Sequence, residues 1–369
     1  MSEQRIAIST YNLALIVATG FLVALLWQLK SLLVILMIAV VLASTLAPII
    51  DKAETLRIPR WLAVILVYLG LIGSLIGAGL LIGPTVSDQI KRLIEQSPSY
   101  LEVLRALAEY WIVRLGLTEP EALTPVWQFF DIQYLTSWVI RSSQQLLVSS
   151  YGITRGFLGG IFSLILAVLF SGYMLSGSEN LAKGLANLFP YPWNERLSAQ
   201  VKPVSYRMGS YIQGRVLVSS ILAVAISVGL SILGLSEFAL SLGIIAGFTN
   251  LIPFFGPILG AIPALIVAIA QGGWTFLWVL LLFVMIQNLE AYVLDPLLVG
   301  TSVKIHPLYQ LLAVLGGTQV LGIIGAVIVP PWIAGAAVLL ENLYLKPKLR
   351  AEQQAIASSS EQEASLLKR

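Results

Sequence analysis

The sequence predicts an all-α, polytopic membrane protein with about eight transmembrane helices, one or more of them broken or re-entrant, plus an amphipathic helical insertion. The chain is 57% hydrophobic and 11% charged, with a mean hydropathy of +0.88. Soluble domains carry about 25% charged residues, so this chain cannot cover a soluble surface. Several apolar runs approach the ~20 residues that a helix needs to cross a bilayer.

Residues 1–83 are expected to form a helical hairpin and a third span. The apolar runs Leu13–Leu29 and Leu32–Ile50 have almost nothing between them, which predicts a tight hairpin. A short charged loop over 51–60 leads to a third span, Trp61–Ile82, whose glycines have the small-xxx-small spacing that permits close helix packing. The first run lacks a small-residue cleavage site, so we interpret it as a retained span.

Residues 84–151 differ from the rest of the chain. Acidic and basic residues alternate there with apolar residues at helical spacing, as in Tyr100, Leu104, Leu107 and Trp111. This pattern predicts amphipathic helices outside the hydrocarbon, packed on each other or on the membrane surface. Charges on such helices usually form a solvated face, so the sequence assigns the insertion no function.

Residues 152–345 are expected to form a transmembrane transport core, followed by a polar cytoplasmic tail over 346–369 that is disordered or a frayed helix. The spans expected here are Gly152–Ser176, Met208–Leu235 (with Arg215 in its first turns), Trp274–Leu294 and Leu308–Leu340. The last of these is long and interrupted by Gly316, Gly317, Gly322, Gly325, Pro330 and Pro331.

The stretch Phe238–Ala270 is too long for one simple span and holds a cluster of prolines and glycines at its centre. We predict a helix, an unwound or kinked middle and a second half-helix, which either cross the membrane or re-enter it. Broken backbone at membrane depth is tolerated where it is buried in protein or lines a water-filled cavity, as in transporter ion and solute sites.

Orientation follows from the lysines and arginines. Eight crossings place both termini on one side, and that side collects most of the basic residues of the short loops and of the tail. The positive-inside rule therefore predicts that both termini are cytoplasmic.

The candidate site residues surround the broken stretch and the span that follows it. Candidates for the solute or ion path are Asn250, Pro253, Gly256, Pro257, Gln287, Asn288, Glu290 and Arg215. Candidates for hinges or close packing are Gly260, Pro263, Pro296, Gly300, Gly322, Gly325 and Pro330.

Glu290 is the central candidate, because an ionisable group in a membrane span is costly and commonly serves function. It either binds a proton or cation, or makes a structural hydrogen bond to another helix or to the broken stretch. Arg215 either pairs with Glu290 or with an anionic solute, or extends to the cytoplasmic surface. Asp295, directly before Pro296, is expected at a helix end.

Several function classes are excluded or disfavoured. The chain has no cysteine and one histidine, His306, so no metal site is expected. No serine elbow, Walker-type loop or histidine pair at metal spacing occurs, so we expect no enzyme and no cofactor. The net charge of +3 gives no reason to expect nucleic-acid binding.

Four segments resemble the signature of the autoinducer-2 exporter family, also called PerM-type permeases. They are NLIPFFGPILGAIPA (250–264), QNLEAYVLDPLLVG (287–300), VKIHPL (303–308) and GIIGAVIVPPWIAG (322–335). The order of elements is similar over nearly the whole chain. This chain departs from the family pattern at Leu297, where a basic residue is frequent, and at the doubled proline Pro330–Pro331 before Trp332.

The resemblance implies a transporter of the bacterial plasma (inner) membrane and a homo-oligomer, a pentamer. Some relatives are associated with export of a small quorum-sensing sugar derivative, and others with sodium/proton antiport. We therefore predict a secondary transporter or facilitator that moves a small solute by alternating access, an autoinducer-2-like molecule being one candidate. The alternatives are a sodium(cation)/proton antiporter and a non-transporting membrane scaffold.

Overall fold

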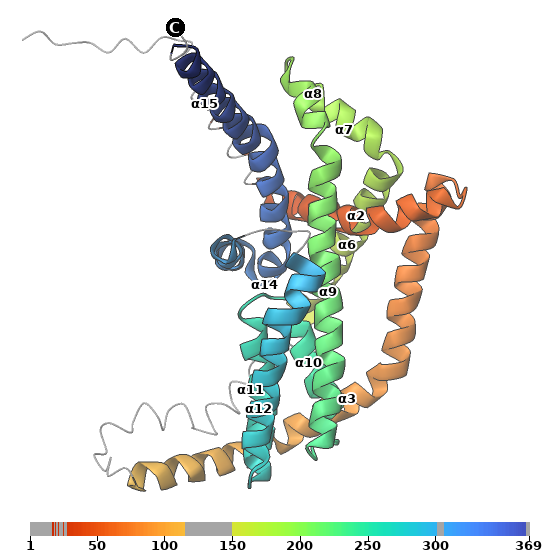
Figure 1. Cartoon of the computed structure of the whole chain (residues 1–369). Coiled ribbons are helices and arrows are strands. Elements are labelled where there is room, and N and C mark those ends of the chain that lie inside the picture. The colour runs from red at the N-terminus through yellow and green to blue at the C-terminus, as the bar shows by residue number, and fades with distance from the viewer. Residues whose placement is uncertain are drawn as a thin grey trace, which may run out of the picture.

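The computed structural model describes residues 28–114, 150–300 and 306–366, together with isolated positions 17, 19, 21 and 25. Most of the predicted first span, residues 115–149 of the insertion, residues 301–305 and the last three residues of the tail lie outside the description. Over the described ranges every regular element is a helix (Figure 1). The helices are α2 (Lys30–Thr55), α3 (Arg60–Arg114), α6 (Ser150–Ser176), α7 (Ser178–Ala186), α8 (Trp193–Ser198), α9 (Val201–Ile232), α10 (Ala239–Thr249), α11 (Gly256–Gln271), α12 (Thr275–Leu289), the π-helix η1 (Glu290–Gly300), α14 (Pro307–Leu340), the π-helix η2 (Glu341–Leu345) and α15 (Lys346–Leu366).

The all-α membrane fold is confirmed. Within the described ranges, five helices are long and apolar enough to cross a membrane, or up to six if the bent pair α6–α7 is one span. The predicted count of eight is not confirmed. The tail, expected to be disordered or a frayed helix, is helical as α15 up to Leu366.

The stretch predicted to break in its middle forms a helical hairpin, α10 and α11. α10 runs antiparallel to α9, with Gly247 against Ala223, and α11 runs back along α10, with Gly260 against Ala246 and Thr249. The chain turns between Thr249 and Gly256, so both open ends of the hairpin lie near the end of α9 and the start of α12 (Figure 1). Both helices are too short to span a bilayer alone.

α14 also folds back on itself, whereas the sequence predicted one long crossing. Gly322 has φ 66 and ψ −151, a backbone conformation that glycine adopts readily. The reversal brings Gly317 against the backbone of Gly325, at a distance that leaves no room for a Cβ on either residue. Gln310 before the reversal and Gly335 after it both pack on the first half of α9.

The two reversals contact different parts of α9. The α10–α11 hairpin opens at the end where α9 stops (Figure 1), whereas both halves of α14 contact the first half of α9. Both hairpins pack on α9, which places this helix at the centre of the core. α2 crosses the first half of α9, where Gly209 lies against the backbone of Ser44.

The predicted third span and the start of the insertion belong to one helix, because α3 continues through Pro84 and Pro98 to Arg114. A proline removes one backbone hydrogen bond and bends a helix without necessarily ending it. The second half of α3 lies beneath the open end of the α10–α11 hairpin (Figure 1). There the Ser241 amide donates to Gln89 Oε1 at 2.8 Å, and Arg92 pairs with Glu237 at 3.4 Å.

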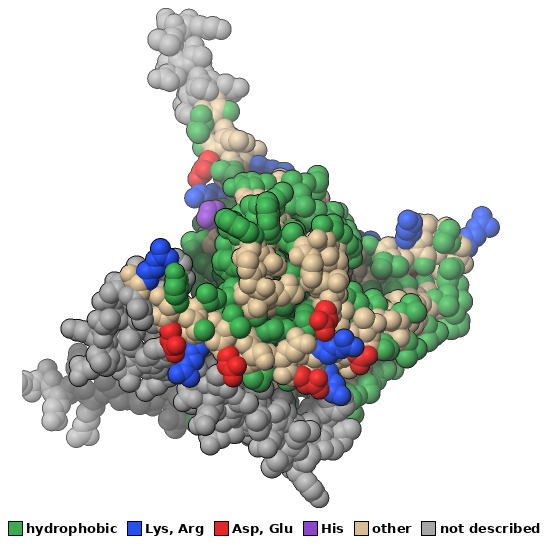
Figure 2. Space-filling model, turned by 90° about the horizontal axis from the view of Figure 1, so that it is seen from below, with side chains coloured by type: hydrophobic (Ala, Val, Ile, Leu, Met, Phe, Trp, Pro, Cys, Tyr) green, Lys and Arg blue, Asp and Glu red, His purple; other side chains and the backbone are tan. Residues whose placement is uncertain are grey.

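This arm of α3 is amphipathic, as predicted for 84–114. Leu93 and Tyr100 pack against the core of α9–α12, while charged residues of the arm remain exposed. Figure 2, which views this face from below, shows Lys/Arg and Asp/Glu side chains in a band across a largely hydrophobic surface. Charges distributed in this way fit a helix that lies outside the hydrocarbon.

The contact between α2 and α9 leads to a stability prediction. A Cβ at Gly209 would lie 2.1 Å from the Ser44 carbonyl oxygen, whereas a Cβ at Gly77 on α3 meets nothing within 4 Å. We expect Gly209→Ala to lower the free energy of unfolding by about 1–3 kcal/mol. Gly77→Ala should be neutral or stabilising by up to about 1 kcal/mol. Thermal unfolding in detergent tests both, and equal midpoints for the two variants would contradict the packing described.

Candidate functional site

A buried ion pair lies at the centre of the core. The guanidinium of Arg215 on α9 donates from Nη1 to Glu290 Oε1 at 3.0 Å. The side chains are 5% and 4% exposed, respectively. The pairing predicted as one of the two alternatives for Arg215 is therefore present. The helix that carries Arg215 is longer than the predicted span Met208–Leu235, because α9 begins at Val201.

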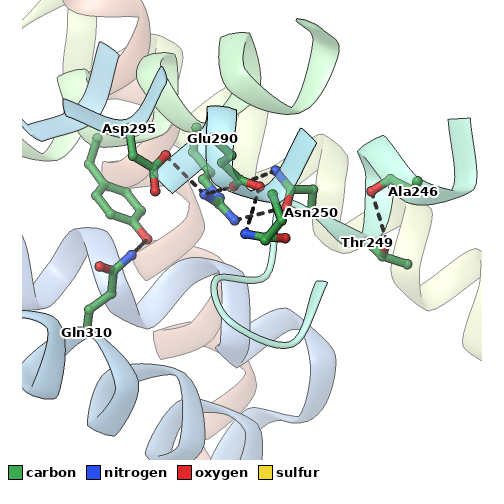
Figure 3. Close-up of polar contacts among 9 residues, drawn as sticks. Ala246, Thr249, Asn250, Glu290, Asp295 and Gln310 are labelled. Carbon is green, nitrogen blue, oxygen red and sulfur yellow. Dashed lines mark hydrogen bonds and ion pairs between the residues drawn. The ribbon is translucent and has the colours of Figure 1, made fainter. Parts of the chain in front are cut away.

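Asn250 closes this pair into a three-residue cluster (Figure 3). Its Nδ2 donates to Glu290 Oε1 at 3.0 Å, and its Oδ1 accepts from Arg215 Nη2 at 3.4 Å. Asn250 is 2% exposed and lies at the tip of the α10–α11 hairpin. The hairpin tip thus supplies the amide of Asn250, which hydrogen-bonds both the acid and the base.

The sequence of the tip explains how Asn250 reaches this depth. Gly256 packs so tightly on the backbone of Thr249 and Asn250 that a Cβ would lie 2.1 Å from the Thr249 carbonyl oxygen. Pro253 is buried within the turn, and Pro257 occupies the first turn of α11, where its missing amide costs nothing. These residues hold the turn compact rather than contributing polar groups.

Asp295 extends the cluster toward the surface. Its Oδ1 lies 3.5 Å from the same Arg215 Nη1, and its side chain is 41% exposed. The expectation of a helix end at Asp295 was wrong, because the π-helix η1 continues through Pro296 to Gly300. π-helical turns are rare and occur frequently at functional sites. In the view of Figure 3, Asp295 and Asn250 lie on opposite sides of Glu290.

The second reversal also contributes a polar contact to α9. Gln310, near the start of α14, donates to the hydroxyl of buried Tyr211 at 3.1 Å. Tyr211 lies one turn before Arg215, so the two hairpins contact α9 at consecutive turns. Sequence reasoning missed Tyr211 and Gln310. The available signal was their position, since Tyr211 and Arg215 share a helix face at i, i+4.

Two of the predicted path residues are peripheral. Gln287 donates to Glu290 Oε2 only at 3.5 Å and is largely exposed, and Asn288 turns away to the Val284 carbonyl oxygen at 2.7 Å. Of the predicted hinge residues, those that make a reversal or a close backbone contact are Gly260, Gly322 and Gly325. The others lie within helices or at their ends: Pro263 in α11, Pro296 and Gly300 in η1, and Pro330 in α14.

The charges in this core are few, and most of them meet at one place. The sequences of α10, α11, α12 and α14 contain no Asp, Glu, Lys, Arg or His. Between residues 208 and 300, the charged residues besides Arg215, Glu290 and Asp295 reduce to Glu237, which pairs with the arm of α3. A buried charge must be paired to be tolerated, so these three side chains depend on one another.

Broken helices around a buried charged cluster define a class of protein, the multi-pass membrane transporters. The family model described as AI-2E family transporter matches residues 15–345. The chain therefore belongs to the AI-2E transporter family, as the resemblance of its motifs predicted.

Curated relatives match over most of their length. YrrI of Bacillus subtilis is 29% identical over 333 residues, which cover 87% of this chain and 90% of the relative. YueF of the same organism is 28% identical over 321 residues, 85% of each chain. PerM of Escherichia coli is 26% identical over 306 residues, 82% of this chain and 84% of the relative. The first two carry provisional names as transport proteins and the third as a permease.

Because Arg215 is shared by Glu290 and Asp295, substitutions in the cluster should lower the free energy of unfolding by different amounts. Arg215→Gln leaves both carboxylates without their cation and should cost about 3–5 kcal/mol. Glu290→Gln should cost less, because Arg215 keeps Asp295 and the new amide still bonds Asn250. The double variant should be less destabilised than the sum of the two. Unfolding in detergent measures all three, and additive costs would show that the pair is not coupled.

Proposed function

We propose that the chain is a secondary transporter for a small polar solute, in which Glu290 is the coupling acid. The observation that carries the proposal is the ion cluster of Arg215, Glu290 and Asn250 at the tip of a helical hairpin. An ionisable group at this depth is expensive, and a plain membrane anchor requires neither the charge nor the broken helices.

The two hairpins support an alternating-access mechanism. They attach to consecutive turns of α9, one through Asn250 and one through Gln310. Displacement of one hairpin would open the surroundings of the cluster while the other hairpin remains in contact. Two gates around a fixed site are what alternating access requires.

The identity of the solute follows less directly. The name of the family favours export of an autoinducer-2-like molecule, a small hydroxylated compound for which Asn250 and Tyr211 supply hydrogen-bonding groups. A sodium(cation)/proton antiporter is the second candidate, since one arginine with two carboxylates leaves the cluster one negative charge in excess when both acids are ionised.

We further propose a location in a bacterial plasma (inner) membrane, both termini cytoplasmic, and a homo-oligomer, a pentamer. Support for the orientation comes from the fold. Arg207 pairs with Glu341 at 3.0 Å, so the basic start of α9 and the segment before α15 share one end of the molecule. The arm of α3 lies at the other end (Figure 1). Cysteines placed at Ser198 and Ser97 of this cysteine-free chain would report opposite sides by labelling.

Flux in proteoliposomes tests the transport proposal. Vesicles containing the purified chain are loaded with a panel of polar solutes, autoinducer-2 among them, under imposed sodium and proton gradients. We expect gradient-driven flux that Glu290→Gln reduces at least tenfold, because the neutral amide cannot exchange a cation. Glu237→Gln is the matched control, an exposed acid whose pairing with Arg92 lies far from the cluster.

Three results would contradict this assignment. Flux that runs only down the solute gradient in the wild type would make the chain a facilitator. Equal flux in Glu290→Gln and wild type would remove the acid from the mechanism. No flux of any solute or cation would favour the scaffold.

A further inference from the structure

We propose that Glu290 and Asp295 share one exchangeable proton through Arg215, with Asp295 as the acid through which that proton enters and leaves. This inference deepens the proposed function, since it assigns the coupling ion and its route. It rests first on the geometry of one nitrogen. Arg215 Nη1 lies 3.0 Å from Glu290 Oε1 and 3.5 Å from Asp295 Oδ1.

The charge balance requires one neutralising cation. With both acids ionised the cluster carries two negative charges and one positive charge, and the apolar surroundings disfavour the excess negative charge. One proton bound to either acid neutralises this charge. If the proton is on Asp295, Arg215 pairs with Glu290; if it is on Glu290, Arg215 pairs with Asp295. The guanidinium can serve either acid almost without moving, because a single nitrogen already faces both.

The cluster also has hydrogen-bonding capacity that it does not use. Among the described residues, Arg215 Nε and Ser219 Oγ, one turn apart on α9, are buried polar atoms without a partner. An arginine with an unused donor is not locked into a single arrangement, since its donors can be redistributed at little loss. The second arrangement, with Asp295 as the main acceptor, is therefore accessible.

The two acids differ in access. Glu290 is 4% exposed and held on one side by Asn250, while Asp295 is 41% exposed on the other side. A proton from water thus reaches Asp295 first. As the partnership of Arg215 passes from Glu290 to Asp295, the O–H bond of Asp295 breaks and solvent water carries its proton to a carboxylate oxygen of Glu290, next to the hairpin tip. Arg215 keeps all of its own protons.

The groups that face this pair leave few competitors. Besides the two acids of η1, α9 contributes Arg215 and Tyr211, which both keep their protons near neutral pH. The other polar side chains are the amides of Asn250, Gln287 and Gln310, which do not titrate. α10, α11, α12 and α14 contain no acidic or basic side chain, and the other charged residues of α9 are Lys202 and Arg207, of which Arg207, two turns before Arg215, pairs with Glu341. Proton uptake by this cluster is therefore attributable to Glu290 and Asp295.

Proton counting on the purified full chain tests the proposal without any solute. Potentiometric titrations in detergent, between about pH 5 and 9, compare the wild type with Glu290→Gln, Asp295→Asn and the double variant. A shared proton predicts that each single variant loses one proton and that the double variant loses the same one. Two independent acids predict the loss of two in the double variant.

Controls keep each outcome decisive. Asp51→Asn is the matched substitution, an exposed acid 3.3 Å from Arg60, and it should lose no proton in this range. Asp295→Glu should retain the shared proton, and thermal unfolding identifies variants that fail to fold. No loss in Asp295→Asn, or a loss seen only in sodium and absent in choline, would overturn the proposal. A shared proton in a chain without flux would instead refute the proposed transport alone.

Discussion

The pairing of Arg215 with Glu290 is the constraint on which the rest of the core depends. Each of these charges is too costly to bury alone, and neither can reach water from its position on α9 or at the start of η1. The protein meets this cost by inserting a third element, the hairpin tip with Asn250, between two long helices. The tight glycine contacts of the hairpin serve to place one amide, and the break in the membrane-depth backbone is buried against protein as it must be.

The same pairing explains why the π-helix begins where it does. Glu290 is the first residue of η1, and the wider turn follows directly after the ion pair. One turn later Asp295 faces the same guanidinium, while Leu298 lies so close to Gly214 that a Cβ there would meet the Leu298 carbonyl oxygen at 2.4 Å. A glycine one residue before the arginine is thus a packing requirement that lets η1 approach α9 and brings both acids within reach of one cation.

Sequence reasoning found the site because its residues are chemically conspicuous. Glu290, Arg215 and Asn250 are polar groups in apolar surroundings, and the proline–glycine cluster marks the break between α10 and α11. The features that sequence reasoning missed depend on contacts between helices that are far apart in the sequence. No local pattern shows that Gln310 reaches Tyr211, or that Arg215 lies in mid-helix, because helix length past the hydrocarbon depends on tertiary contacts such as Arg207 with Glu341. The interruptions of Leu308–Leu340 were visible in the sequence, but several glycines in an apolar run are ordinary in membrane helices, so they did not show that the chain reverses at Gly322.

The predicted number of membrane crossings depends on how two apolar runs of the sequence fold. Phe238–Ala270 and Leu308–Leu340, both counted among the eight predicted crossings, are folded back in the structure. That both termini share a side stays a prediction, because it depends on how many of the described helices cross the membrane. A crossing helix and a hairpin differ in the movements that they permit. A crossing helix only connects two sides, whereas a hairpin open to one side can withdraw toward it without breaking the chain path. Arg215 contacts the tip of the α10–α11 hairpin, and Tyr211, one turn away on α9, contacts α14. A displacement of either hairpin would therefore change the surroundings of the same part of α9.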